Sequence, residues 1–159
     1  MSITQGESEV KLGSMSDMLQ IEAAWWRLIE DQQRLDARAE DTELNHMRAH
    51  RFLESRIKQG RIVVAKASEA VVGMLIIAPD GFFLQGGPQV WLLSDLWVDR
   101  GWRRQGIATA LIQAAEERAR QLGVDELRLS VYKENGPARV LYSGQGYEPL
   151  AEELRKRLN

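Results

Sequence analysis

The sequence predicts a single α/β domain of the α+β type spanning residues 1–159. Short β-branched or alternating runs, typical of strands, interchange with longer segments whose apolar residues recur every three or four positions, as in helices. A length of 159 residues also suits one domain. We find no internal repeat, linker or second domain in the chain.

The N-terminal part predicts a weak strand followed by two helices. Residues 9–12 alternate as a strand, and Asp17 is a candidate N-cap for a helix over residues 18–33. Thr42 is a candidate N-cap for a second helix, which ends at Gly60. The positions expected on the buried faces of these helices are Leu19, Ala23, Trp26 and Ile29 or Glu30 in the first, and Leu44, Met47, Phe52 and Ile57 in the second.

The middle of the chain predicts a hairpin and then a fourth strand. Residues 61–66 and 70–78 are β-branched runs joined by a short turn at residues 67–69. Pro79, Asp80 and Gly81 break the second run. A loop of about ten residues then leads into a strand over residues 89–98.

The C-terminal part alternates helix and strand. The strongest helix is predicted over residues 104–122, with Gly123 as its stop. Residues 126–132 alternate as a fifth strand, and Pro137 suits the first turn of a short helix that ends by Gly146. The spacing of Leu150, Leu154 and Leu158 favours a helix for residues 147–158, although a closing strand is also open.

The junction between the fourth strand and the long helix predicts an anion site. The apolar strand runs into a turn that contains Arg103, Arg104 and Gly106. Such a turn presents main-chain N–H groups and the positive end of the helix dipole to an anion. The two adjacent arginines add permanent positive charge. A phosphate or a pyrophosphate is therefore the natural ligand.

Two motifs resemble the signatures of the GNAT superfamily of acyl-CoA N-acyltransferases. The run Arg-x-x-Gly-x-Ala at residues 103–108 resembles the family's pyrophosphate motif. The run Asn-x-x-Ala-x-x-Leu-Tyr at residues 135–142, followed by Gly-Tyr at residues 146–147, resembles the family's second hallmark. The two blocks stand in the family's order and together cover roughly residues 89–150.

This resemblance implies a fold and a cofactor site. The expected fold is a mixed, mostly antiparallel sheet flanked by helices, in the order β-α-α-β-β-β-α-β-α-β, with strands 4 and 5 splayed apart. A β-bulge is expected near residues 96–98, where freed main-chain groups would pair with the pantetheine arm of coenzyme A. The implied cofactor-binding residues are Leu96, Trp97, Val98, Arg103, Arg104, Gln105, Gly106, Ile107, Ala108, Thr109, Asn135 and Ala138.

The resemblance also implies direct transfer of an acetyl group from acetyl-CoA to a primary amine in a ternary complex. The N–H of Val98 is the expected oxyanion donor, and Tyr142 matches the family's general acid. A tyrosine buried in the core is the alternative for Tyr142. Asp95 is the only carboxylate on the matching stretch of strand, so it is the candidate base. Loss of the proton through a chain of waters is the alternative.

Two further functions stay open at the level of the sequence. One is a non-catalytic module that binds or senses acyl-CoA, and the other is transfer of a different acyl group. The acceptor, a small-molecule amine or a peptide or protein amine, is expected between the N-terminal helices and the fourth strand. A cationic acceptor would be drawn to the acidic residues of that region, although a solvated helix end explains them equally well: Glu30, Asp31, Asp36, Glu40 and Asp41.

Composition argues against several other classes. A formal net charge of −2 gives no indication of nucleic-acid binding, and no apolar run approaches the ~20 residues of a membrane span. The absence of cysteine excludes thiolate chemistry and suits the cytoplasm. His46 and His50 have the spacing of two metal ligands, but no third ligand is evident, so no metal is expected. Because relatives carry a further strand that a partner could supply, a homodimer is favoured.

Overall fold

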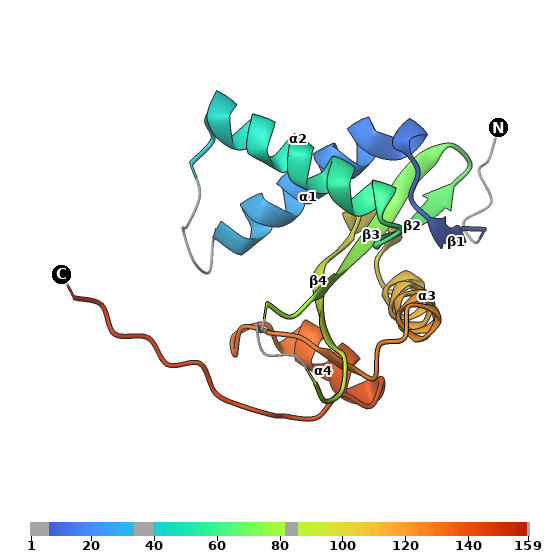
Figure 1. Ribbon diagram of the computed structural model, residues 1–159. Coiled ribbons are helices and arrows are strands. Elements are labelled where there is room, and N and C mark those ends of the chain that lie inside the picture. Colours follow the sequence, from blue (N-terminus) through green and yellow to red (C-terminus); the bar gives the residue numbers. More distant parts are fainter. Residues whose placement is uncertain (1–6, 34–39, 82–85, 159) are drawn as a thin grey trace.

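The computed structural model describes residues 7–33, 40–81 and 86–158, and the side chain of Gln33 is outside that description. The predicted loops around residues 34–39 and 82–85, including Asp36, therefore lie outside the described residues. Figure 1 shows a central sheet with the paired helices α1 and α2 on one side and α3 on the other. The elements follow the expected order as far as α4, and the bounds are given below.

Five strands form one sheet in the order β1-β2-β3-β4-β5. The strands are β1 (Glu9–Leu12), β2 (Ile62–Ala67), β3 (Ala70–Pro79), β4 (Val90–Val98) and β5 (Glu126–Arg128). Neighbouring strands are antiparallel, except that β5 lies parallel to β4. The mixed, mostly antiparallel sheet expected from the sequence is thus confirmed.

The alternation of side chains along β2 divides the core into two layers. Ile62 and Val64 pack with the first layer of helices, α1 (Met18–Gln33) and α2 (Glu43–Lys58). Val63 and Ala65 point to the opposite face and pack with α3 (Ile107–Gln121). Because successive side chains of a strand point to opposite faces, a run of apolar residues fills both layers.

The N-terminus of α1 differs from the expectation. Asp17 does not cap α1 but ends a short 3-10 turn, Met15–Asp17, that precedes it. The carboxylate of Asp17 accepts hydrogen bonds from the N–H and the hydroxyl of Ser14, at 3.1 and 2.8 Å. It also accepts from Nζ of Lys66 at 2.8 Å, and both partners are almost fully buried. Asp17 therefore fastens the start of α1 to β2.

The predicted apolar faces of the first two helices are partly wrong. In α1 the buried residues are Met18, Ile21, Ala24 and Leu28, whereas the side chain of Leu19 is 80% exposed. In α2, Ala49, Leu53 and Ile57 are buried, while Leu44 and Met47 are about half exposed. The cap is confirmed, because the hydroxyl of Thr42 accepts a hydrogen bond from the N–H of Asn45 at 3.2 Å.

The C-terminal elements are shorter than expected. The helix α3 begins at Ile107 rather than at residue 104, because Arg104 and Gly106 have φ values of +60° and +80°, which a right-handed helix does not accept. The strand β5 ends at Arg128, and α4 spans Gly136–Gly144. Residues 147–158 form neither the helix nor the closing strand, and Figure 1 shows them extending away from α4.

Candidate active site

The strand β4 carries a bulge at Asp95 and Leu96. Ile76 of β3 lies opposite Ser94, whereas Met74, two residues away, lies opposite Trp97. Two residues of β4 therefore face the single residue Leu75, and Asp95 has a φ of +52°. The expected bulge is present, and it begins one residue earlier than the predicted 96–98.

The end of β4 directs main-chain groups away from β3. The N–H of Asp99 donates to the carbonyl of Val72 at 2.9 Å, so Asp99 points its N–H toward β3. Because hydrogen-bonding directions alternate along a strand, the N–H and C=O of Val98 point to the opposite side. On that side β5 is paired with β4 only at Val90–Leu92. Val98 thus faces the opening where the two strands part.

The turn before α3 has a left-handed glycine and an uncapped helix start. Gly106 adopts a left-handed conformation at the N-cap, and a Cβ placed there would meet no atom within 4 Å. No side chain caps the helix. The N–H groups of Ile107, Ala108 and Thr109 belong to the first turn, in which the main chain offers no intrahelical acceptor. These N–H groups lie next to the exposed Arg104, an arrangement that suits an anionic ligand.

The two arginines of the motif lie differently. Nε of Arg103 donates to the carbonyl oxygen of Val98 at 2.9 Å, and its guanidinium also lies 3.5 Å from the carboxylate of Asp31. Arg100 contacts the same carboxylate at 3.2 Å. Asp31 therefore joins α1 to the turn, and the charge of Arg103 is shared with protein acceptors. Arg104 is exposed, and its guanidinium forms no ion pair with any of the described residues.

The second motif forms α4. The side chain of Asn135 caps this helix by accepting a hydrogen bond from the N–H of Ala138 at 3.3 Å. Tyr142 is partly buried against the α3 layer, and its ring contacts that of Tyr147 edge to face, with centroids 5.9 Å apart. Burial raises the pKa of Tyr142, so its hydroxyl stays protonated at neutral pH. The hydroxyl of Tyr147 is already committed, since it donates to Glu116 at 3.2 Å.

Asp95 lies in a partly buried, mostly apolar setting on the α1/α2 side of β4. Nε1 of Trp25 donates to its carboxylate at 3.2 Å. Burial raises the pKa of Asp95, while hydrogen bonds from Ser94 and Trp25 and the positive charge of Arg56 oppose the rise. The sequence predicts the position of Asp95 on the strand. It does not predict the hydrogen bond from Trp25 or the nearby charge of Arg56, since Arg56 stands out in the sequence only as a basic residue in the last turn of α2.

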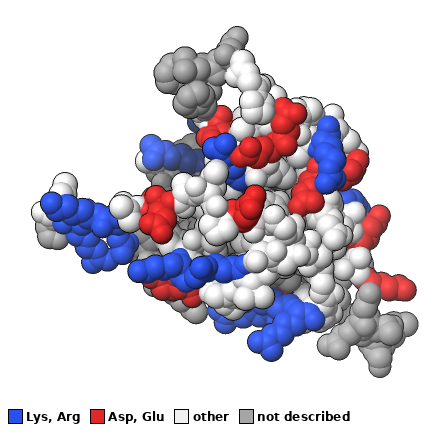
Figure 2. All heavy atoms as spheres, turned by 90° about the horizontal axis from the view of Figure 1, so that it is seen from below, with Lys and Arg blue, Asp and Glu red and all other residues white. Residues whose placement is uncertain are grey.

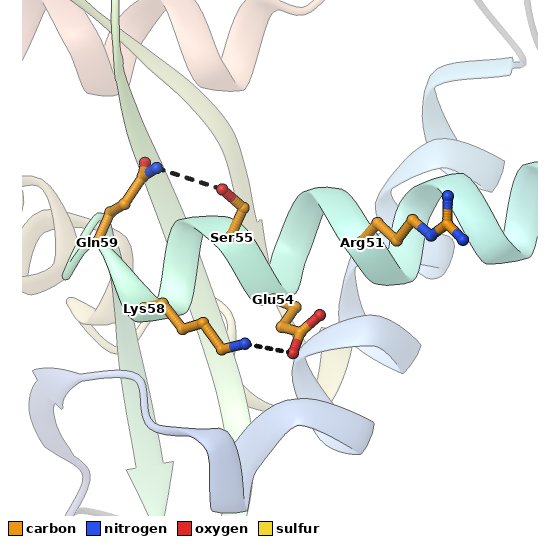
Figure 3. A pocket seen from close by; sticks show the side chains of 5 residues that line it. All are labelled: Arg51, Glu54, Ser55, Lys58 and Gln59. Atoms are coloured by element: carbon orange, nitrogen blue, oxygen red, sulfur yellow. Dashed lines mark hydrogen bonds and ion pairs between the residues drawn. The ribbon is translucent and has the colours of Figure 1, made fainter.

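Two surface hollows accompany the α1/α2 layer. The first, of about 290 Å³, lies along α2 and is lined by Arg51, Glu54, Ser55, Lys58 and Gln59. Figure 3 shows that Glu54 and Lys58 pair with each other, as do Ser55 and Gln59, while Arg51 points away. The second, of about 200 Å³, is lined by Trp26, Ile29, Glu30, Asp41 and His46. Its carboxylates suit a cationic group.

The described residues show neither a membrane span nor a metal cluster. Within those residues, no helix is long and apolar enough to cross a bilayer. In the same part of the chain, no group of three or more His, Asp or Glu side chains could hold a metal ion. His46 pairs with Asp41 at 2.6 Å and His50 with Glu22 at 2.9 Å, so the two histidines have different partners. Basic and acidic side chains occur side by side over the face shown in Figure 2.

Comparison with known proteins identifies the family. The acetyltransferase (GNAT) family model matches residues 17–147. The uncharacterized N-acetyltransferase YhfO of Bacillus subtilis (strain 168) is 30% identical over 102 residues, which are 63% of this chain and 68% of that protein.

Two solved structures share the fold. One is a predicted acetyltransferase from Clostridium acetobutylicum with acetyl-CoA, at a TM-score of 0.73 and 16% identity, covering 96% of this chain and 97% of that one. The other is an aminoglycoside acetyltransferase from an uncultured soil metagenomic sample in complex with sisomicin, at a TM-score of 0.70 and 18% identity, with the same coverage of both chains. The chain is therefore an N-acetyltransferase that belongs to the GNAT family.

Proposed function

We propose that this enzyme transfers an acetyl group from acetyl-CoA to a primary amine by direct attack within a ternary complex in the cytoplasm. The observation that carries the proposal is the position of Val98. Its N–H lies on the edge of β4 that is not paired with β5, a few residues before the uncapped N-terminus of α3. This arrangement offers hydrogen bonds to a thioester at one end and to a diphosphate at the other.

The residues present fit coenzyme A. The N–H groups of residues 104–109 would hold the diphosphate, and Arg104 would add charge. The edge of β4 at Leu96, Trp97 and Val98 would pair with the pantetheine arm as an added strand does. Asn135 and Ala138 would contact the same arm from the start of α4, although the Asn135 side chain also caps the helix.

Acetyl-CoA supplies an activated acetyl thioester, and the protein supplies the charge stabilisation and the proton transfers. The N–H of Val98 donates to the carbonyl oxygen as negative charge develops on it. The hydroxyl of Tyr142 gives its proton to the departing sulfur while the carbon–sulfur bond breaks. No hydrogen bond from the Tyr142 hydroxyl is found among the described residues, which supports its availability for this step.

Asp95 is proposed to take one proton from the ammonium group of the acceptor, so that the neutral amine can attack the thioester, while the second proton that the nitrogen loses as the carbon–nitrogen bond forms passes to solvent. A carboxylate whose pKa is raised is a better base than an ordinary aspartate. Its position in the bulge, on the α1/α2 side, places it where an acceptor would approach the end of β4. The hydrogen bond from Trp25 to Oδ1 fixes the orientation of the carboxylate.

We also propose that the amine arrives as a cation. Glu30 and Asp41 line the hollow between α1 and α2, and the aromatic ring of Trp26 forms part of its wall. Asp31 contributes less, because Arg100 and Arg103 already neutralise it. The structural neighbour in complex with sisomicin, an aminoglycoside acetyltransferase, is consistent with a cationic acceptor.

The test is to incubate the protein with acetyl-CoA and a panel of amines, and to follow thiol release and the mass of the acetylated product. Thiol release that depends on one class of amine, together with a product whose mass is higher than that of the amine by one acetyl group, supports the proposal. Coenzyme A binding without thiol release above background hydrolysis contradicts it. Release only from a thioester with another acyl group would contradict the acetyl assignment.

A homodimer is proposed on the basis of the C-terminal tail. Leu150, Leu154 and Leu158 are 68%, 88% and 86% exposed, and β5 is the last strand of the sheet. A second copy could cover these leucines and pair with the outer edge of β5. Sedimentation at several concentrations tests this. A chain that stays monomeric at the highest concentration contradicts it.

A further inference from the structure

The side chain of Arg56 has an unused hydrogen-bonding edge beside the candidate base. Nη1 donates to the side-chain oxygen of Gln59 at 3.3 Å. Nε is buried and has no partner, and no carboxylate of the described residues lies within ion-pair distance of this guanidinium. The edge formed by Nε and Nη2 is therefore without an acceptor in the described part of the chain.

This edge has the geometry that a carboxylate requires. Two parallel N–H groups of a guanidinium match the two oxygens of a carboxylate, and such bidentate pairs are among the strongest hydrogen bonds in proteins. A buried N–H without an acceptor is unfavourable, and an anionic ligand removes that cost. The guanidinium lies over the ring of Phe52, with its central carbon Cζ 5.0 Å from the ring centroid.

The position of Arg56 connects this edge to the reaction. Its positive charge is close enough to Asp95 to oppose the rise in the pKa of that carboxyl. Trp25, which donates to Asp95, also contacts Phe52, with ring centroids 6.2 Å apart. A chain of contacts therefore runs from the carboxylate of Asp95 through Trp25 and Phe52 to the guanidinium of Arg56.

We propose that Arg56 binds a carboxylate on the acceptor, so that the acceptor is an amino acid or a similar small zwitterion. The inference rests on the proposed function, because it places the amine of this acceptor at Asp95. The ammonium group would face Asp95 as the carboxylate meets the Nε–Nη2 edge of Arg56. A substrate with the two groups a few bonds apart satisfies both residues at once.

The kinetic test compares three acceptors that differ in one group. For the amino acid that turns over best, its carboxamide and its decarboxylated amine are assayed beside it. We expect KM to be at least ~10-fold lower for the amino acid, as for a charge-assisted pair worth about 1.4 kcal/mol. Arg56→Gln should remove this preference and leave the KM of the two analogues that lack the carboxylate nearly the same, while Arg56→Lys should keep part of the preference.

Arg51→Gln is the matched control, because it removes the same charge from an exposed position of the same helix. This variant should keep the preference intact. Equal KM values for the amino acid and its carboxamide in the native enzyme would overturn the proposal. An equal rise in KM for all three acceptors in Arg56→Gln would also overturn it. Melting curves with and without coenzyme A show whether each variant is folded.

A binding measurement separates this proposal from the proposed function. Calorimetric titration of the amino acid into the protein saturated with coenzyme A needs no turnover. Arg56-dependent binding supports the proposal even where no acetyl transfer occurs, in which case only the proposed function fails. Acetyl transfer to amines with no binding advantage for a carboxylate overturns this proposal alone. An aminoalkyl phosphate that binds better than the amino acid would also overturn it.

Discussion

Nε of Arg103 donates to the main-chain oxygen of Val98 at 2.9 Å, across the turn that separates β4 from α3. The side chain therefore fixes the residue whose N–H is proposed to meet the thioester. Arg104, the next residue, has an exposed side chain and a left-handed main chain. Two adjacent arginines of one motif thus lie differently, one bonded to the end of β4 and the other exposed, where it is proposed to attract the diphosphate.

Arg104→Glu should weaken the binding of coenzyme A by roughly 10-fold at low salt, because it replaces a favourable charge by a repulsive one beside the diphosphate. The effect should shrink at high salt. Calorimetric Kd values at two ionic strengths measure it, with Arg51→Glu as the control for net charge. An unchanged Kd would remove Arg104 from the diphosphate site.

Tyr142→Phe should lower kcat by ~10²-fold and leave the affinity for coenzyme A nearly the same. The reason is that the hydroxyl is proposed to act only as the sulfur departs. Steady-state kinetics and a binding titration together make the test. Tyr147→Phe is the comparison, because it removes a hydroxyl that is bonded to Glu116. Normal turnover in the Tyr142 variant would mean that this tyrosine belongs to the core only.

The dependence of kcat/KM on pH should show the titration of Asp95. Its raised pKa means that the carboxylate form, which can accept a proton, appears only as pH rises above the ordinary range for aspartate. The acid limb of kcat/KM should therefore rise through that pKa, and Asp95→Asn should lose the limb along with ~10²-fold of the rate. An identical profile in the variant would favour proton loss through water.

Asp17→Asn should lower Tm by roughly 10 °C at neutral pH, because it leaves the buried Lys66 ammonium without its closest carboxylate. Burial acts to raise the pKa of Asp17, but hydrogen bonds from Lys66 and Ser14 outweigh it and lower the pKa below the usual 3.8. A group with a lowered pKa stabilises the fold above the unfolded value and loses that effect as the pH falls through the folded value.

The difference in Tm between the native chain and Asp17→Asn should therefore shrink as the pH drops below about 3.8. Calorimetric scans at neutral and acidic pH measure it. Glu54→Gln, which breaks the exposed pair with Lys58, is the control and should change Tm little at any pH. A difference in Tm between the two proteins that stays constant down to acidic pH would show that the Asp17–Lys66 pair does not stabilise the fold electrostatically.

The sequence predicted the elements that local chemistry determines. The Gly106 turn, the Thr42 cap and the Asn135 helix follow from residues within a few positions of one another. The buried face of α1 was not predicted correctly from the sequence. Met18 and Leu19 are both apolar, and the 3-10 turn before them, which orients the start of the helix, places Met18 and not Leu19 in the core.

Side-chain directions in the candidate site depend on contacts between distant parts of the chain. Arg103 turns toward α1 because Asp31, far earlier in the sequence, offers a carboxylate there. The indole N–H of Trp25 likewise reaches Asp95, which lies far along the chain. Arg56 carried no motif at all. Such relationships arise only when the helices are laid on the sheet.

The three paired positions that join β4 to β5 have a consequence for exchange of reactants. Beyond Leu92 β4 and β5 are not paired, so a pantetheine arm that pairs with the edge of β4 as proposed breaks no hydrogen bond between these two strands when it enters or leaves. Exchange of the spent thiol for a fresh thioester would therefore leave the strand pairing of the sheet unchanged.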